Sequence, residues 1–215
     1  MTDPGGSVRD MSTPTTAPED PKATLLRYLA RERASLLAKA EGLGEYDVRR
    51  PMTRTGSNVL GLLKHVASVQ AGYLCDTFGG THDLAMPWFD DEDAEVDADM
   101  WATADESREE ILELFRRSSE VSDATVAGLD LDARGEVPWW PPERRVVTLH
   151  QILVHMLDEM AHHAGHVDIV RELVDGAAGN GRGDLPDQSD AEWAAYRQRV
   201  EDAAVEAARR AGERV

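Results

Sequence analysis

The most constraining feature of this chain is a run of about 28 residues, from Thr148 to Gly176, with the spacing of one long amphipathic helix. Thr148 and Gln151 form a capping-box pattern at its start, and Gly176 follows its last periodic residue. At about 100° per residue, its apolar side chains fall on one arc: Ile152, Leu153, Met156, Met160, Val167, Val170 and Val174. A helix of roughly 42 Å is long for a globular protein and typical of a helical bundle.

Two further helices are predicted in the first 80 residues. Pro21, preceded by an aspartate cap, opens a helix that runs to Gly42. Ser57 caps the second helix, and the Gly79-Gly80 pair stops it. Residues 1–20 are rich in Pro, Thr, Ser and Gly and have no hydrophobic period, which predicts a disordered tail.

Capping boxes mark the remaining helices. Thr103-x-x-Glu106 predicts the start of the third helix, and Ser189-x-x-Glu192 predicts the start of a fifth. The expected fold class is therefore all-α, a four-helix bundle over residues 21–178 with the segment 79–102 as a long crossover between its second and third helices. Residues 179–215 then form a loop and an appended C-terminal helix over 189–212. No strand, repeat or second domain is predicted.

The long helix also carries a group of potential metal ligands. Four of the seven histidines lie between residues 155 and 166. His163 falls within the apolar arc, and Glu159 and His166 lie at its edge, roughly 40–60° away, so all three side chains can point into one buried seam. His162 lies roughly 100° from His163, which makes His162-x-x-x-His166 a poorer pair than Glu159-x-x-x-His163. A set of Glu and His ligands suits Zn²⁺ or another divalent transition ion, but one helix seldom supplies a complete site.

A further ligand has to come from elsewhere in the chain, and His65 is its best candidate. On the wheel of the second helix, His65 stands within about 60° of Leu62, at the border of an apolar stripe, so it can face a neighbouring helix. The alternative interpretation is that these histidines are polar residues at helix borders, hydrogen-bonded or partly solvated. Spacing alone leaves both interpretations open.

Several motifs in combination resemble those of the DinB/YfiT-like superfamily. They are Asn58-Val-Leu-Gly-Leu-Leu-Lys-His65, Pro138-Trp-Trp-Pro, Thr148-Leu-His-Gln-Ile-Leu-Val-His-Met, and Glu159-x-x-x-His163-x-Gly-His166-x-Asp-x-x-Arg-Glu. More narrowly, roughly residues 21–205 are similar to the actinobacterial branch that includes mycothiol S-transferases and mycothiol-dependent maleylpyruvate isomerase.

This resemblance implies a metal site with His65, Glu159 and His163 as ligands, in agreement with the helical wheel. Many members of the superfamily have three histidines, and the maleylpyruvate isomerase type has glutamate where Glu159 stands. Zinc is the first choice of metal, with nickel or another transition ion as alternatives, and mycothiol is the implied thiol cosubstrate. His166 takes a position that is often glutamine in other branches. We expect it to be catalytic, as a proton carrier or hydrogen-bonding group beside the metal, because a fourth ligand would close the site.

The expected function is that of a thiol S-transferase, in which the metal holds a low-molecular-weight thiol as thiolate for attack on an electrophile. Three protein ligands leave a coordination position that water could take instead, which would make the protein a metal-dependent hydrolase. A third hypothesis is a non-catalytic helical binding or scaffold protein with vestigial histidines. The aromatic segments Met86–Phe89 and Trp139-Trp140 either wall a substrate cleft or pack at the edge of the core.

Composition excludes several other classes. A net charge of −18 opposes binding to nucleic acid or anionic lipid, and the acid-rich stretch 90–99 is most simply a solvated loop. Cys75 is the only cysteine, so no intrachain disulfide can form. The first 20 residues lack a signal-peptide core and no run of 18 apolar residues exists, so we expect a cytoplasmic protein with no membrane partner. Its expected partners are a small-molecule thiol and an electrophilic substrate, and a homodimer is left open.

Overall fold

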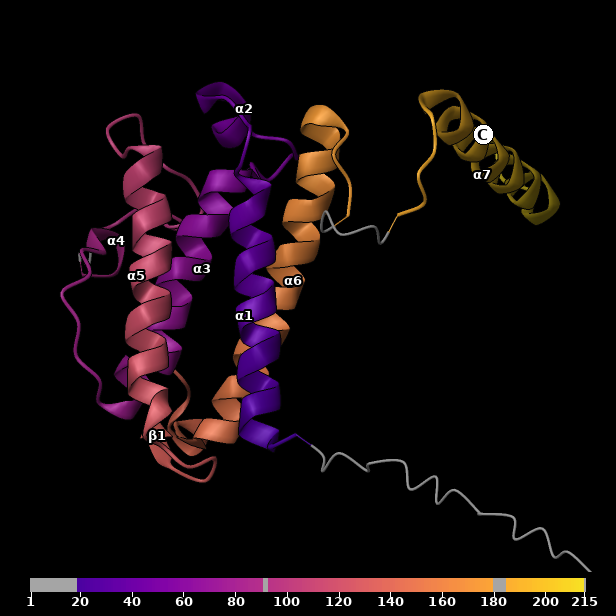
Figure 1. The fold of residues 1–215 in the computed structure, drawn as a ribbon. Helices are drawn as coiled ribbons and strands as arrows, with labels where there is room; N and C mark the ends of the chain where they lie inside the picture. The colour runs from indigo at the N-terminus through magenta and orange to yellow at the C-terminus, as the bar shows by residue number, and fades with distance from the viewer. Residues whose placement is uncertain (1–18, 91–92, 180–184, 215) are drawn as a thin grey trace, which may run out of the picture.

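The protein is an all-α bundle with one short hairpin, as the computed structural model of residues 19–90, 93–179 and 185–214 shows (Figure 1). Its helices are α1 (Pro21–Lys39), α2 (Glu45–Arg49), α3 (Val59–Leu74), α4 (Pro87–Asp90), α5 (Arg108–Ala127), α6 (Leu149–Asp175) and α7 (Asp190–Ala211). The four long helices α1, α3, α5 and α6 form the bundle. The predicted fold class is therefore confirmed.

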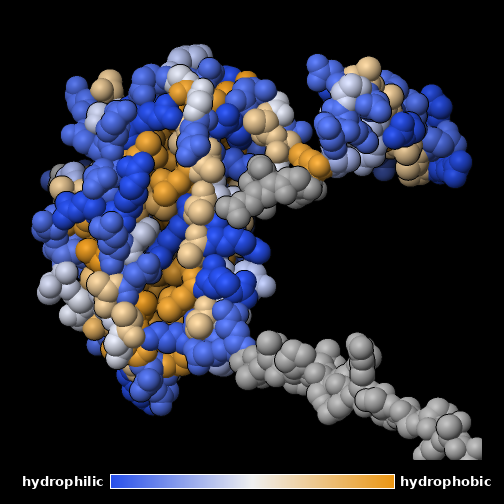
Figure 2. All heavy atoms as spheres, viewed as in Figure 1, coloured by the Kyte–Doolittle hydropathy of each residue, from blue (hydrophilic) through white to orange (hydrophobic). Residues whose placement is uncertain are grey.

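Helix α3 holds the bundle together, because it packs against both α5 and α6, while α1 packs mainly against α6. The core between these helices consists of fully buried apolar side chains, among them Leu29, Leu36, Leu60, Leu63, Phe115, Ile152, Leu153, Met156 and Met160. Long cationic side chains link α1 to α5. Lys22 Nζ of α1 donates to the carbonyl of Ala127, the last residue of α5, at 3.0 Å, and buried Arg33 pairs with Asp123 at 2.7 Å. Apolar side chains show at the surface between these two helices (Figure 2).

Two of the predicted helix starts are confirmed at α6 and α7. The Thr148 hydroxyl accepts a hydrogen bond from the Gln151 amide, and Ser189 and Glu192 form a complete capping box. Helix α6 ends with Gly176 in the left-handed conformation, at φ 79°, as a glycine C-cap should. The 27 residues of α6 are close to the predicted length.

Two other predicted starts are wrong by one and four residues. Asn58 rather than Ser57 caps α3, because its amide oxygen accepts from the Gly61 amide at 2.8 Å. Helix α5 begins after Ser107, whose capping box with Glu110 is complete. At the earlier candidate box the Glu106 carboxylate accepts from the Thr103 amide and pairs with Lys64, but the chain turns there and does not yet enter a helix.

The prediction that no strand exists is also wrong. Strand β1 (Arg134–Glu136) pairs antiparallel with β2 (Val146–Thr148), with Gly135 opposite Val147. Three-residue strands are too short to show a period of two in the sequence. The hairpin supports the loop that carries Trp139-Trp140, and β2 leads directly into α6.

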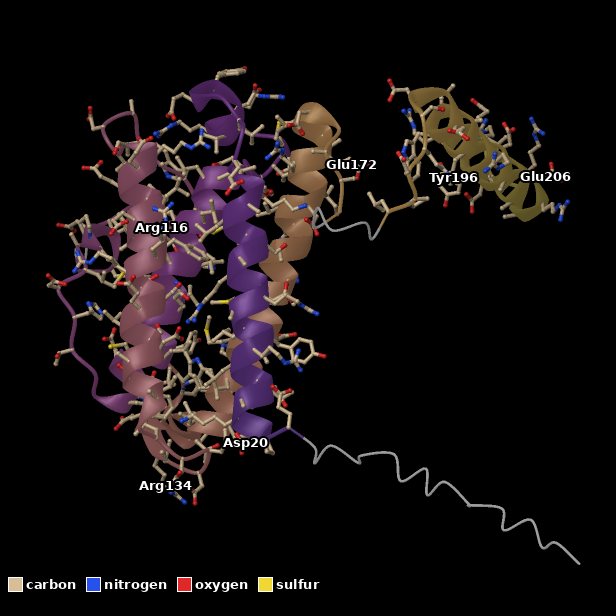
Figure 3. The ribbon with its side chains drawn as sticks, in the orientation of Figure 1. Asp20, Arg116, Arg134, Glu172, Tyr196 and Glu206 are labelled. Carbon is tan, nitrogen blue, oxygen red and sulfur yellow. The ribbon has the colours of Figure 1, made fainter. Side chains whose placement is uncertain are left out.

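The C-terminal helix α7 is not part of the bundle (Figure 1). Residues 1–18, most of the predicted N-terminal tail, are outside the described residues, as are 180–184 in the loop before α7. Helix α7, which carries Tyr196 and Glu206, has no buried residue and lies apart from the four helices of the bundle (Figures 1 and 3). None of the described helices combines the length and the apolar character that crossing a membrane requires.

Gly61 allows the crossover between α3 and α5 to approach α3 closely. A Cβ atom at Gly61 would lie 1.8 Å from the carbonyl oxygen of Met100, so the backbone would have to move. We expect Gly61→Ala to lower the free energy of unfolding in urea by about 1–3 kcal/mol, despite the higher helix propensity of alanine.

Gly165 in α6 is the matched control, because a Cβ there would meet no atom within 4 Å. Gly165→Ala should be neutral or raise the free energy of unfolding by up to about 1 kcal/mol. Equal stabilities of the two variants would show that the crossover does not pack against Gly61.

Candidate metal centre

Helices α3 and α6 bring the three predicted ligands together. His65 on α3 and Glu159 on α6 are half-buried, and His163 on α6 is buried. One ligand atom from each residue lies within 4.8 Å of the other two. The His163 Nε2 and Glu159 Oε2 atoms are 3.3 Å apart, and the centroids of the two imidazole rings are 4.7 Å apart.

This donor set has the composition and spacing of a mononuclear metal site. Ligand atoms that each lie about 2 Å from a zinc ion are about 3–4 Å from one another, so small side-chain rotations would close the group around one ion. Two imidazoles and a carboxylate supply three of the four positions that zinc favours. The remaining position would be accessible to a substrate atom.

His65 is held in place by a residue that the sequence analysis missed. Its Nδ1 atom lies 2.6 Å from Oδ2 of Asp99. Burial alone would raise the pKa of Asp99, but the hydrogen bond from His65 and the positive charges of His65 and Lys64 lower it below its usual value. An ionised Asp99 accepts the Nδ1 proton, which fixes the ring tautomer and leaves Nε2 free to bind a metal ion.

Asp99 is an exception to the prediction that the acid-rich stretch 90–99 is a solvated loop, whereas Asp93, Glu95 and Asp97 are exposed as expected. The Asp99 side chain is 16% exposed and faces His65. Asp99 lies in an irregular segment, 34 residues after His65, so helical periodicity could not predict the contact between them.

Lys64, next to His65, fixes the crossover that carries Asp99. Its ammonium group is almost fully buried and donates to the carbonyl oxygens of Ala98 at 2.9 Å and Trp101 at 3.0 Å. It also pairs with the Glu106 carboxylate at 2.7 Å and lies 3.9 Å from the centre of the Trp88 ring. The two carbonyls flank Asp99, so Lys64 sets the backbone from which the carboxylate reaches His65.

His163 is kept neutral by its surroundings. Burial, followed by the nearby charge of His65, lowers its pKa from 6.5 to about 4, although Glu159 acts in the opposite direction. Because protonation is disfavoured in the folded state, folding stability should decrease as the pH falls from about 6.5 toward 4. Its Nδ1 atom is buried and has no hydrogen-bond partner among the described residues. A neutral ring with an unpaired nitrogen is consistent with a ligand role.

His166 does not point into the buried seam, contrary to the expectation from the helical wheel. Both His166 and His162 are exposed, and their ring centroids lie 4.3 Å apart. The centroid of His166 is 5.7 Å from that of His163. On this turn of α6, the buried positions are taken by Ala164 and Val167, which turns the side chain of His166 toward solvent.

An aromatic cluster lies one helical turn from Glu159. It consists of Tyr73, Trp139, Trp140 and His155, and both indole nitrogens donate to the Tyr73 hydroxyl, at 3.3 and 2.9 Å. The His155 ring is 4.6 Å from that of Tyr73, and its buried Nε2 has no hydrogen-bond partner among the described residues. Of the two aromatic segments predicted to wall a cleft, this one is near the candidate site.

The other segment lies at a separate cavity of about 620 Å³. Trp88 lines that cavity together with side chains of α5, including Ile111 and Leu114. None of the three candidate ligands borders it. This cavity is therefore separate from the group of His65, Glu159 and His163.

Comparison with known proteins identifies the family. No match was found among the curated proteins. The sequence model of the mycothiol-S-transferase family matches residues 24–176, from the first turn of α1 to the C-cap of α6, and leaves out α7. That range is well over half of the chain and includes every residue of the candidate centre. The protein therefore belongs to the mycothiol S-transferase family.

Proposed function

We propose that the protein is a divalent-metal-dependent S-transferase that activates the thiol of mycothiol for attack on an electrophile. In this proposal, His65, Glu159 and His163 hold the metal, which is zinc or a similar transition ion. The observation that carries the proposal is the convergence of these three side chains from two helices, with ionised Asp99 behind His65. A cytoplasmic location, where small thiols are kept reduced, fits this activity.

The metal would lower the pKa of a thiol and favour the thiolate, which is the attacking form. The residues of the chain prepare the site for that ligand. Asp99 orients His65, and burial keeps His163 neutral, so His163 does not have to lose a proton at neutral pH before it can bind the ion. We assign His166 the role of carrying the proton released by the thiol to solvent, because it is exposed and close to His163.

The aromatic cluster of Tyr73, Trp139, Trp140 and His155 is the proposed contact surface for the rest of the substrates. Trp139 is 54% exposed, so much of its ring is available to a bound molecule. Aromatic faces favour apolar electrophiles and the CH-bearing faces of sugars. His155, the member of the cluster on α6, lies one turn before Glu159, so the cluster would hold such groups beside the proposed metal ligands.

Alanine variants test the ligand assignment. His65→Ala, Glu159→Ala and His163→Ala should each reduce the metal content after dialysis from about one ion per chain to below about 0.2, because two remaining ligands bind weakly. Metal analysis of the folded variants measures this. His162→Ala should keep its ion, and an equal loss in that variant would mean that the site lies on the exposed face of α6.

Asp99→Asn tests the orientation of His65. Asparagine keeps the shape but not the charge, so zinc affinity should fall about 10- to 100-fold while the fold is unchanged. Competition with a chromophoric chelator gives the affinity, and Asp105→Asn, at an exposed position in the same crossover, is the control. An unchanged affinity in Asp99→Asn would show that the carboxylate does not support a ligand.

A thiol-binding experiment distinguishes the transferase hypothesis from the hydrolase hypothesis. Cobalt-substituted protein should develop a sulfur-to-metal charge-transfer band when mycothiol is added, with proton release near neutral pH. Mycothiol should bind more tightly than a simple thiol, because its sugar groups add contacts along the cleft. If no band forms and the protein cleaves an ester or amide without thiol, the hydrolase hypothesis replaces this one. Metal-free purified protein would instead favour a scaffold role.

A further inference from the structure

We propose that His162 and His166 form a second, surface-exposed site for a divalent transition-metal ion, from which the ion passes to the buried ligands. Both residues lie on α6 and are exposed, outside the group of His65, Glu159 and His163. The binding of an ion by this pair does not depend on the proposed function. Its role in metal delivery rests on the proposed metal centre.

The geometry of the pair is that of a two-histidine chelate. His162 and His166 are four residues apart on one helix, so their side chains are neighbours on its surface. Their ring centroids are 4.3 Å apart with the ring planes at 74°. Rotation about the side-chain bonds can turn one nitrogen of each ring toward a common ion at about 2 Å, the arrangement that His-x-x-x-His pairs adopt on zinc-binding helices.

The outer pair is connected to the buried group through His163. The centroid of His163 is 5.5 Å from that of His162, 5.7 Å from that of His166, and 4.7 Å from that of His65. Four imidazoles therefore form a continuous row from the surface of α6 to the seam with α3. An ion held by the outer pair is one ring away from a buried ligand, and it can exchange its water molecules for imidazole nitrogens in steps.

The electrostatic surroundings favour capture of a cation at this surface. The chain has a net charge of −18, and exposed Asp158 precedes His162 by one helical turn. A negative surface raises the local concentration of cations and the rate at which they bind. The side chain of His163, by contrast, is only 11% exposed, so it is less accessible to an ion in solvent than the two exposed histidines are.

Binding by the outer pair can be measured when the buried site is disabled. The untagged full-length chain with His65→Ala and Glu159→Ala should still bind one Ni²⁺ ion in a calorimetric titration. Adding His162→Ala or His166→Ala should weaken this binding about 100-fold, because chelation by two linked ligands is lost. His150→Ala is the matched control, since His150 is exposed on the same helix and has Val154 four residues later. Equal affinities of the His162 and His150 variants would overturn the outer site.

Delivery is measured by loading kinetics in the otherwise unaltered apoprotein. After mixing with Co²⁺, the absorption of the buried site should appear at least about tenfold more slowly in His162→Ala than in wild type or His150→Ala, and reach the same final intensity. An unchanged rate would overturn the delivery role, and loss of the final band would make His162 a ligand of the buried site. The wild type could fail to form the Co²⁺ band of the buried site while the His65→Ala, Glu159→Ala protein still binds Ni²⁺ in the calorimetric titration. That result would contradict the proposed function and support the outer site.

Discussion

The geometry of the candidate metal centre depends on the contacts of the buried ammonium group of Lys64. A charge in the core is costly unless polar groups surround it, and here the crossover supplies two carbonyl oxygens and the Glu106 carboxylate. Those carbonyls belong to Ala98 and Trp101, on either side of Asp99. Because the buried charge of Lys64 needs these hydrogen bonds, it fixes the backbone around Asp99, whose carboxylate contacts His65.

The two histidines of the centre are prepared for metal binding in different ways. His65 is oriented by a hydrogen bond to an ionised carboxylate, whereas His163 is kept neutral by burial, which lowers its pKa to about 4. The crossover has to approach α3 closely for the first of these interactions, and Gly61 leaves room for the Met100 carbonyl. The packing of the crossover and the chemistry of the site thus depend on the same few residues of α3.

The sequence was sufficient to predict those features that local spacing controls. The caps of α6, the four long helices and the grouping of Glu159 with His163 all follow from periodicities within one helix. Asp99 could not be found in this way, because its contact with His65 joins an irregular segment to a helix 34 residues away. The start of α5 was predicted at the capping-box pattern Thr103-x-x-Glu106, whereas the helix begins after the next such pattern, which Ser107 forms with Glu110. His166 lay at the edge of the apolar arc, where the wheel angle does not distinguish a buried from an exposed side chain.

X-ray absorption at the zinc edge tests the central claim most directly, because it identifies the atoms around the metal in solution. Zinc-loaded, dialysed protein without added thiol should show two imidazole rings and additional oxygen scatterers at about 2.0–2.2 Å, and no sulfur. Three or more imidazoles would mean that an outer histidine completes the site. Sulfur would point to Cys75, which is buried in the structure. Either result would contradict a centre built from His65, Glu159 and His163 with a position left open for a thiol.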